Sequence, residues 1–221
     1  MEASQKDILA GGEKIAMHRH GAPYAAIVVA GAYREHSIDG AFLCRPGHVV
    51  FHPAMHAHAN EAQDVGAEIV NVALPAAALG FDGYRIAFLA EIERALAAND
   101  RASALIALLQ AAAPDPAPLV NTDWTSRLAF RLKNGGGALG DLVEVKLSRS
   151  HVSRAFHARR GMTTRAFRRE CRLRRAMLLL SEGARPLEAA MGAGYADQAH
   201  LTRELKRETG MTPARFRAGL D

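Results

Sequence analysis

Seven of the ten histidines of this 221-residue chain fall within its first 58 residues, where they could build a metal or effector site. His18 and His20 are two positions apart in a segment typical of a β-strand, so both side chains are predicted to lie on one face of a sheet. If that face lines an interior, His58 can join them as a third nitrogen ligand. Imidazole nitrogens suit Zn, Ni, Cu or Fe ions. The alternatives are surface or hydrogen-bonded histidines, or a metal-free pocket for an organic effector.

The residues around these histidines resemble the first sequence motif of the cupin family, G-x5-H-x-H-x3-E-x6-G, except that Tyr24 replaces the glutamate. Pro53 and His58 resemble part of the second cupin motif, in which Met55 stands in place of a glycine. A non-haem iron oxygenase usually needs a carboxylate beside two histidines, so Tyr24 disfavours that chemistry. The metal or effector site that the resemblance implies comprises His18, His20, Tyr24 and His58.

A second feature is a pattern in the last third of the chain that occurs twice, shifted by 49 positions. Each copy begins with a helix N-cap residue, Ser148 or Asp197, and ends at a glycine, Gly161 or Gly210. Between these ends lies an apolar stripe with basic residues on the other faces. This pattern predicts two helix-turn-helix modules, each of which presents its second helix to the major groove of DNA.

The exposed faces of the two second helices supply the candidate DNA contacts. Arginine pairs well with guanine and glutamine with adenine, and alanine can touch a thymine methyl group. A single basic residue more often contacts phosphate, as we expect of Arg159, Arg160 and Lys206. The candidate DNA-binding residues are Arg149, Ser150, Ser153, Arg154, His157, Gln198, Ala199, His200, Thr202, Arg203 and Lys206.

The charge of the chain is divided unevenly. Residues 1–118 carry 8 Lys/Arg against 13 Asp/Glu, whereas residues 119–221 carry 20 against 10. A strongly basic half indicates that it binds a polyanion such as a nucleic acid. The alternative is a charged surface that keeps the protein in solution.

The cysteines and the hydropathy of the chain indicate the cellular compartment in which it functions. Cys44 and Cys171 lie in different halves and cannot build a disulfide framework, which suits a reducing cytosol. The first residues lack the apolar region of a signal peptide, and the longest apolar run is too short to span a bilayer. We therefore expect a cytoplasmic protein without a membrane partner.

The elements that position these residues change in type after Pro75. Short β-rich runs separated by turns fill residues 15–74 and predict a barrel or sandwich. Residues 84–98 and 102–113 have the apolar spacing of helices. These helices are expected to cover the sheet, and could also supply a dimer contact through Ile86, Leu89, Glu93 and Leu96.

The rest of the chain is predicted to be helical after a linker at residues 114–120, where prolines prevent a helix. A capped helix begins at residue 124, and further helices are predicted at 139–145, 149–160, 164–181, 187–191, 197–209 and 213–218. The 164–181 helix would be ~27 Å long at 1.5 Å per residue. With the two modules at its ends, it can place both on one face of a duplex whose major grooves recur every ~34 Å.

Residues 121–221 resemble the DNA-binding domain of AraC/XylS-type transcription regulators. The segments that carry the resemblance are LSRSHVSRAFHARRGMTTRAF, RLRRAMLLL and GYADQAHLTRELKRETGMTPARFR. The resemblance implies seven helices in two subdomains joined by a long helix. Proteins of this type often carry a cupin-like effector barrel, so the resemblances of the two halves predict the same class of protein. The fold class is then α+β in two domains, with a cupin-like β-barrel and following helices at 1–113 and an all-α double helix-turn-helix domain at 121–221.

The leading hypothesis is a sequence-specific transcription regulator, not an enzyme, whose N-terminal domain senses a small molecule or metal ion. Its expected partners are double-stranded DNA, the effector, a second copy in a homodimer and RNA polymerase. Two alternatives stay open. A metal-dependent cupin enzyme would turn over a substrate at an open coordination position. A nonspecific nucleic-acid-binding protein would hold any duplex with similar affinity and release it in salt.

Overall fold

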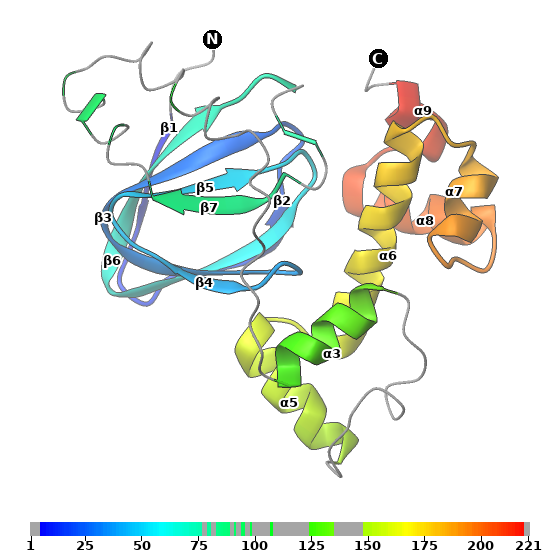
Figure 1. The fold of residues 1–221 in the computed structure, drawn as a ribbon, viewed down its shortest axis with the longest axis horizontal. Helices are drawn as coiled ribbons and strands as arrows, with labels where there is room; N and C mark the ends of the chain where they lie inside the picture. The colour runs from blue at the N-terminus through cyan, green and yellow to red at the C-terminus, as the bar shows by residue number, and fades with distance from the viewer. Residues whose placement is uncertain are drawn as a thin grey trace. The chain divides into compact units, whose positions relative to one another are not determined.

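The computed structural model of the chain describes residues 5–76, 79–80, 83–88, 124–134 and 148–218, and five isolated positions between residues 91 and 107. The chain divides into two compact units, Met1–Pro118 and Leu119–Asp221. The first is rich in strands and the second is helical (Figure 1), which confirms the predicted α+β class at this level. The predicted linker at 114–120 and the predicted helix at 139–145 lie outside the described residues.

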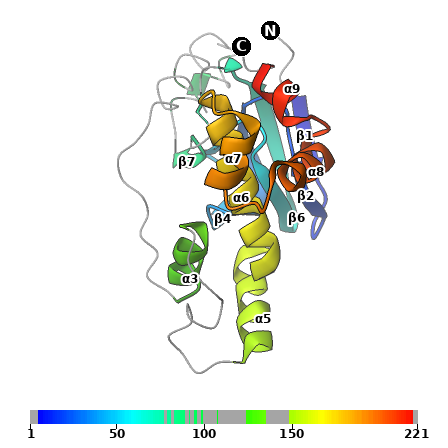
Figure 2. The same cartoon turned by 90° about the vertical axis from the view of Figure 1, so that its right-hand side faces the viewer.

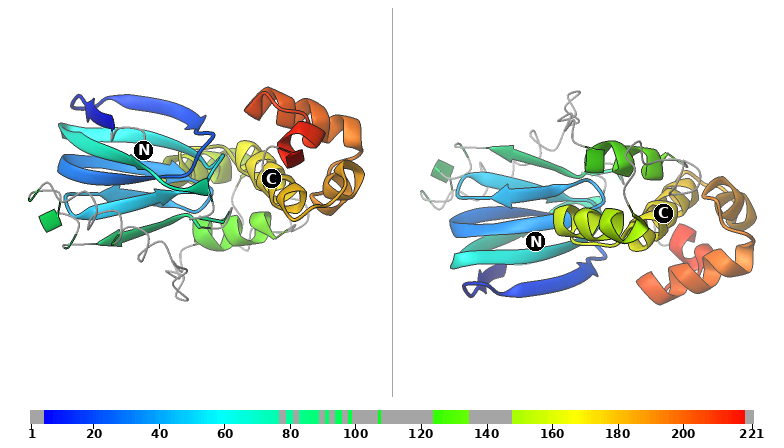
Figure 3. Two further views of the ribbon diagram at one scale, coloured as in Figure 1. Left: turned by 90° about the horizontal axis from the view of Figure 1, so that it is seen from above. Right: turned by 90° about the horizontal axis from the view of Figure 1, so that it is seen from below.

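Within its described residues, the first unit holds one antiparallel sheet of seven strands. Its main path runs β1-β6-β3-β5-β7, while β2 pairs with β6 and β4 pairs with β3. Figure 3 shows β1 and β2, in dark blue, at one edge of this sheet and β7, in green, at the other. The strands are β1 (Gln5–Leu9), β2 (Lys14–Arg19), β3 (Tyr24–Ser37), β4 (Ala41–Cys44), β5 (His48–His52), β6 (Ala57–Ala73) and β7 (Arg85–Phe88).

The register of the sheet brings together side chains that are far apart in the sequence. His18 of β2 lies opposite His58 of β6. Tyr24 at the start of β3 lies opposite His52 at the end of β5. Apolar residues such as Val50 fill the core around these positions. Pairing of the long strands β3 and β6 fixes this arrangement, because a slip of one residue would turn every side chain to the other face.

The predicted helix over residues 84–98 is wrong at its start. Arg85–Phe88 form the strand β7, in which Ile86 lies opposite Val50 of β5. Ile86 is half-buried and packs against the core of the sheet. The apolar spacing of such a short run is compatible with a strand as well as a helix, and pairing with β5 decides between them. The other residues of the predicted dimer stripe, Leu89, Glu93 and Leu96, lie outside the described residues.

The helices of the second unit follow the predicted pattern closely. The ranges 149–160, 164–181 and 213–218 are confirmed, the predicted helix 197–209 begins one residue later, and the predicted helix 187–191 is longer by one residue at each end. The helix α6 contacts each of the other described helices of the unit. Figures 1 and 2 show α5 at one end of α6, and α7 and α8 beside the other. The helices are α3 (Trp124–Lys133), α5 (Arg149–Arg160), α6 (Thr164–Ser181), α7 (Pro186–Gly192), α8 (Gln198–Thr209) and α9 (Pro213–Ala218).

Both copies of the repeat begin and end as predicted. The Ser148 hydroxyl of α5 accepts a hydrogen bond of 3.3 Å from a first-turn amide, and the Asp197 carboxylate of α8 accepts one of 2.6 Å. Gly161 and Gly210 then end the helices with φ of 66° and 74°. This left-handed conformation is easily adopted only by glycine, so the two stops are encoded locally.

The cap of α8 gives a first prediction. Asp197→Ala removes the acceptor of an orphan amide and is expected to lower the free energy of unfolding by about 1 kcal/mol. Trp124, the single tryptophan of the chain, lies on α3 and reports urea unfolding of the helical unit by fluorescence. Asp197→Asn keeps a capping oxygen and is expected to stay close to the unsubstituted protein. Equal losses for the two variants would contradict the capping role.

Candidate nucleic-acid interface and histidine cavity

The helix α8 separates cleanly into a buried and an exposed face. Leu201 and Leu205 are fully buried against the rest of the unit. His200 and Thr202 are half-buried, and Thr202 donates its hydroxyl hydrogen bond to a backbone carbonyl of the same helix. The candidate contacts that are exposed on this helix are Gln198, Ala199, Arg203 and Lys206.

The helix α5 has the same organisation. Val152 and Phe156 are buried, and Phe156 packs edge-to-face on Phe167 of α6 with ring centroids 5.2 Å apart. Arg149 lies in α5, but its side chain is outside the described residues. Ser153 is half-buried, and the exposed candidates of α5 are Ser150, Arg154 and His157.

One predicted phosphate contact is wrong. Arg160 is only 9% exposed, and its Nη2 donates a 3.0 Å hydrogen bond to Oγ of Ser126 in α3. The last turn of α5 therefore uses this arginine to hold α3. Arg159 is exposed, as a phosphate contact must be.

The long helix α6 does more than separate the two modules. Arg169 forms ion pairs with Glu204 and Glu208 of α8, at 3.8 and 3.5 Å. Arg175 donates a 2.7 Å hydrogen bond to the Gly192 carbonyl at the end of α7. Six positions turn an α-helix by ~600°, so these two arginines lie roughly 120° apart around α6 and hold different helices, and their spacing in the sequence gave no sign of these roles.

The first unit contains a small cavity lined largely by polar side chains. Its volume is about 80 Å³, well below the ~300–1,000 Å³ of pockets that hold drug-sized ligands. It opens between strands β1, β2, β3, β5 and β6. The polar side chains that line it are Asp7, His18, His20, Tyr24, Tyr33, His52, His58, Asn60 and Asn71.

Three of the predicted histidines meet at this cavity. His18, His20 and His58 offer nitrogens that all lie within 4.8 Å of one another, and we call them the outer histidine set. Tyr24 lies beside them, with its hydroxyl 3.1 Å from Nε2 of His58. The hydroxyl stands where a carboxylate of the cupin motif would be expected, so the set offers nitrogen ligands without a directly bound carboxylate.

The backbone assigns the tautomers of two of these rings. Nδ1 of His18 lies 2.9 Å from the Ala16 carbonyl, and Nδ1 of His58 lies 3.4 Å from the His56 carbonyl. Because a carbonyl only accepts hydrogen bonds, both Nδ1 atoms must donate. In a neutral ring this leaves the lone pair on Nε2, which is the usual arrangement of a metal-ligating histidine.

The surroundings disfavour the charged form of two of these rings, those of His58 and His20. Burial, assisted by His52, lowers the pKa of His58 to about 2. Burial, followed by the neighbouring His18 and His52, also lowers the pKa of His20. Desolvation disfavours the charged imidazolium, and like charges nearby add to the effect. Neutral imidazole is the form that binds a metal ion.

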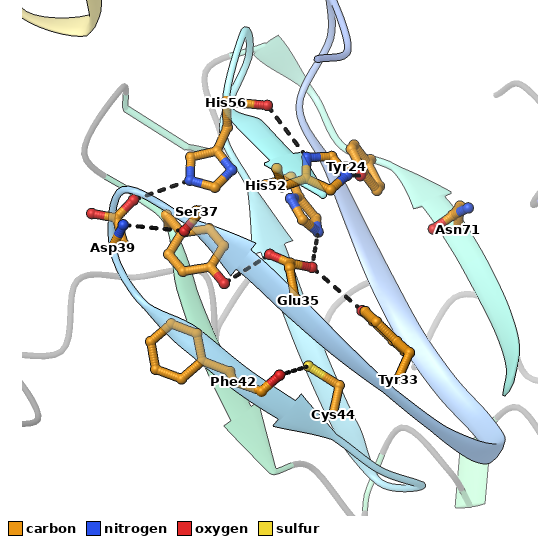
Figure 4. Close-up of polar contacts among 12 residues, drawn as sticks. Tyr24, Tyr33, Glu35, Ser37, Asp39, Phe42, Cys44, His52, His56 and Asn71 are labelled. Carbon is orange, nitrogen blue, oxygen red and sulfur yellow. Dashed lines mark hydrogen bonds and ion pairs between the residues drawn. The ribbon is translucent and has the colours of Figure 1, made fainter. Parts of the chain in front are cut away.

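A buried carboxylate lies behind the cavity and was missed by the sequence reasoning. Glu35 is 0% exposed, its Oε2 lies 3.4 Å from Nε2 of His52, and the Tyr84 hydroxyl donates to its Oε1 at 2.7 Å. Figure 4 shows Glu35 between His52 and Tyr33. Burial alone would raise the pKa of Glu35, but His52, followed by His58 and the Tyr84 hydroxyl, lowers it to about 2. The interior of the first unit thus contains an ionised carboxylate.

Comparison with known proteins assigns the helical unit. The helix-turn-helix domain family matches residues 143–219. The uncharacterised HTH-type transcriptional regulator YbfI of Bacillus subtilis strain 168 is 37% identical over 64 residues, 28% of this chain and 23% of that protein. The arabinose operon regulatory protein of Escherichia coli K12 is 37% identical over 79 residues, which make up 35% of this chain and 27% of that protein. The matches therefore span about a quarter of these relatives.

Similarities between whole structures are weaker. ToxT of Vibrio cholerae O395 aligns over 100% of both chains with a TM-score of 0.45 and 8% identity. Oxalate decarboxylase of Bacillus subtilis aligns over 34% of this chain and 21% of its own, with a TM-score of 0.30 and 23% identity. Neither similarity is high enough to show a shared fold.

The capped helices and the family match define residues 143–219 as a helix-turn-helix domain. Its relatives include arabinose operon regulatory proteins. The domain is of the AraC type, which confirms the resemblance found in the sequence. None of the described helices combines the length and the apolar character needed to cross a membrane.

Proposed function

We propose that the chain is a sequence-specific DNA-binding transcription regulator. The observation that carries this proposal is the equivalence of α5 and α8: both are capped, both pack on α6, and both expose an arginine at the same repeat position, Arg154 and Arg203. The 18 residues of α6 span ~27 Å at 1.5 Å per residue. Major grooves recur every ~34 Å on one side of a duplex, so the bodies of the modules, or a bend in the DNA, would make up the difference.

The proposed division of labour at the DNA follows from exposure and side-chain chemistry. Arg203, Gln198 and Arg154 would read base edges, and Lys206 would contact phosphate. The half-buried His200 and Thr202 would contribute from the edge of α8. The remaining proposed contacts are Arg149, Ser150, Ser153, His157 and Ala199.

We also propose that the first unit is a cupin-like effector domain over residues 1–113, joined by a linker at 114–120 to a DNA-binding domain at 121–221. The outer histidine set with Tyr24 would hold Zn, Ni, Cu or Fe, because burial keeps the rings of His20 and His58 neutral and the Nδ1 hydrogen bonds of His18 and His58 leave the lone pair on Nε2. The small cavity favours a metal ion or a ligand of a few heavy atoms over a large effector. The effector would act by binding two states of the protein with different affinity.

The relatives named as transcriptional regulators support a regulator over an enzyme, and they support a cytoplasmic location. A homodimer and a contact with RNA polymerase complete the proposed set of partners. A dimer would double the number of reading helices on an operator, which raises specificity without any new contact within one chain.

Selection of bound duplexes from a random pool by the full chain tests this function. We expect one enriched sequence, with an affinity at least ~10³-fold above that for a scrambled duplex of the same length and composition at physiological salt. The ratio should be measured at several salt concentrations, because the nonspecific component weakens steeply as salt rises. A pool that stays random, with equal affinities throughout, would overturn the proposal in favour of nonspecific binding.

A further inference from the structure

A second group of histidines lies deeper in the first unit than the outer set. His52, His56 and His58 offer nitrogens within 4.8 Å of one another, and we call them the inner histidine set. The exposed fractions of these residues are 1%, 2% and 2%. Only His58 belongs to both sets. His52 and His56 lie outside the residues that the cupin resemblance assigns to a metal.

Each of the two additional rings is held by a carboxylate at the same nitrogen. Nε2 of His52 lies 3.4 Å from Glu35, and Nε2 of His56 lies 3.0 Å from Asp39. Figure 4 shows both carboxylates beside their rings. A histidine that binds a metal through one nitrogen usually donates its other N–H to a carboxylate or carbonyl, which fixes the tautomer and strengthens the ligand. The carboxylates thus direct the metal-binding role of both rings to Nδ1.

The Nδ1 atom of His52 is unusual in its surroundings. It is buried and has no hydrogen-bond partner among the residues that the structure describes. Leaving a buried polar atom unpaired destabilises the fold, so such atoms are rare unless a ligand, ion or water meets them. A bound metal ion would satisfy this lone pair.

The charge of the neighbourhood also favours a cation. Among the described residues, the ion-pair partner of the fully buried Glu35 is His52, and no Lys or Arg side chain lies within ion-pair distance. A buried charge is costly unless it is paired or coordinates a metal. Three neutral imidazole ligands carry no charge that could balance the +2 charge of a bound ion. The Glu35 and Asp39 carboxylates, which hold two of these rings, would supply the balancing negative charge.

We propose that His52, His56 and His58, backed by Glu35 and Asp39, form a second site for a divalent transition-metal ion. Zinc–nitrogen bonds of 2.0–2.1 Å at tetrahedral angles require ligand nitrogens ~3.3 Å apart, so small side-chain rotations would close the inner set on an ion. His58 has one lone pair while it keeps its Nδ1 proton, so an ion occupies either the inner or the outer set. The proposal extends the effector role of this unit and is independent of DNA reading.

Removing the outer ligands while keeping the inner ones tests this site. The full-length His18→Ala/His20→Ala variant, stripped of metal with a chelator, is titrated with Co²⁺ and followed by visible absorption and by equilibrium dialysis. We expect it to bind one Co²⁺ per chain. Adding His52→Gln and His56→Gln should weaken that binding at least tenfold. Glutamine can still donate to the carboxylates, so circular dichroism should show an unchanged fold.

A milder variant keeps the test valid if the quadruple variant does not fold. Asp39→Asn in the His18→Ala/His20→Ala background removes the carboxylate behind His56, and loss of such a partner weakens metal binding by ~10–100-fold. If replacing His18 and His20 alone abolishes Co²⁺ binding, the proposal of an inner site is wrong and that of the outer site stands. Binding that neither His52 and His56 nor Asp39 affects would equally overturn it. DNA selection by the same proteins tests the regulator assignment separately.

Discussion

Replacing Arg203 with alanine is expected to weaken binding to the selected operator by about 5- to 150-fold and to relax the base preference at one position. Arg203 is exposed on α8, on the side of the helix away from the buried Leu201 and Leu205. A bidentate arginine–guanine pair distinguishes the correct base from its competitors. The measurement is a titration of the protein with the operator and with its three single-base variants at that position.

The matched control for Arg203 is a cation on the same helix. Lys206 is also exposed on α8, but we expect it to contact phosphate. Lys206→Ala should weaken specific and scrambled duplexes alike, and should reduce the slope of log affinity against log salt by about 1. If Arg203→Ala lowers affinity equally for all four bases, Arg203 contacts the backbone and its assignment as a base reader is wrong.

Replacing Phe156 with alanine is expected to lower the free energy of unfolding of the helical unit by about 3–5 kcal/mol. Phe156 is 0% exposed and its ring packs edge-to-face on Phe167, so truncation leaves a cavity between α5 and α6. Folded domains are stable by only about 5–15 kcal/mol, which makes this loss a large part of the total. Urea unfolding followed by Trp124 fluorescence measures it.

The same substitution at an exposed site controls for the loss of an aromatic ring. Phe130 of α3 is 69% exposed, and Phe130→Ala is expected to change stability by no more than ~0.5 kcal/mol. Equal effects of the two substitutions would mean that α5 does not pack on α6 through Phe156. The first recognition helix would then lack the support on which its proposed position depends.

The helical unit was largely predictable because the residues at the ends of its helices determine where those helices begin and end. Ser148 and Asp197 accept the hydrogen bonds that begin α5 and α8, and Gly161 and Gly210 end the same helices. These signals need no knowledge of the rest of the chain. Arg160 was mispredicted for the opposite reason, since its role depends on Ser126 of α3, 34 positions earlier.

The first unit was harder to predict because pairing between distant strands determines it. The strand β7 replaces the start of a predicted helix, since the edge of β5 offers Ile86 a partner that apolar spacing does not reveal. Glu35 was overlooked because a lone glutamate in a strand gives no sign of burial. A weak signal existed, in that Tyr33, Glu35 and Ser37 alternate along β3 and share one buried face.

We propose that α5 and α8 read two neighbouring segments of one duplex, and hydroxyl-radical footprinting of the selected operator tests this claim. We predict two protected segments on the same face of the DNA, with centres about 10–11 base pairs apart. Arg154→Ala should weaken one segment and Arg203→Ala the other. A single protected segment that both substitutions weaken together would contradict the claim.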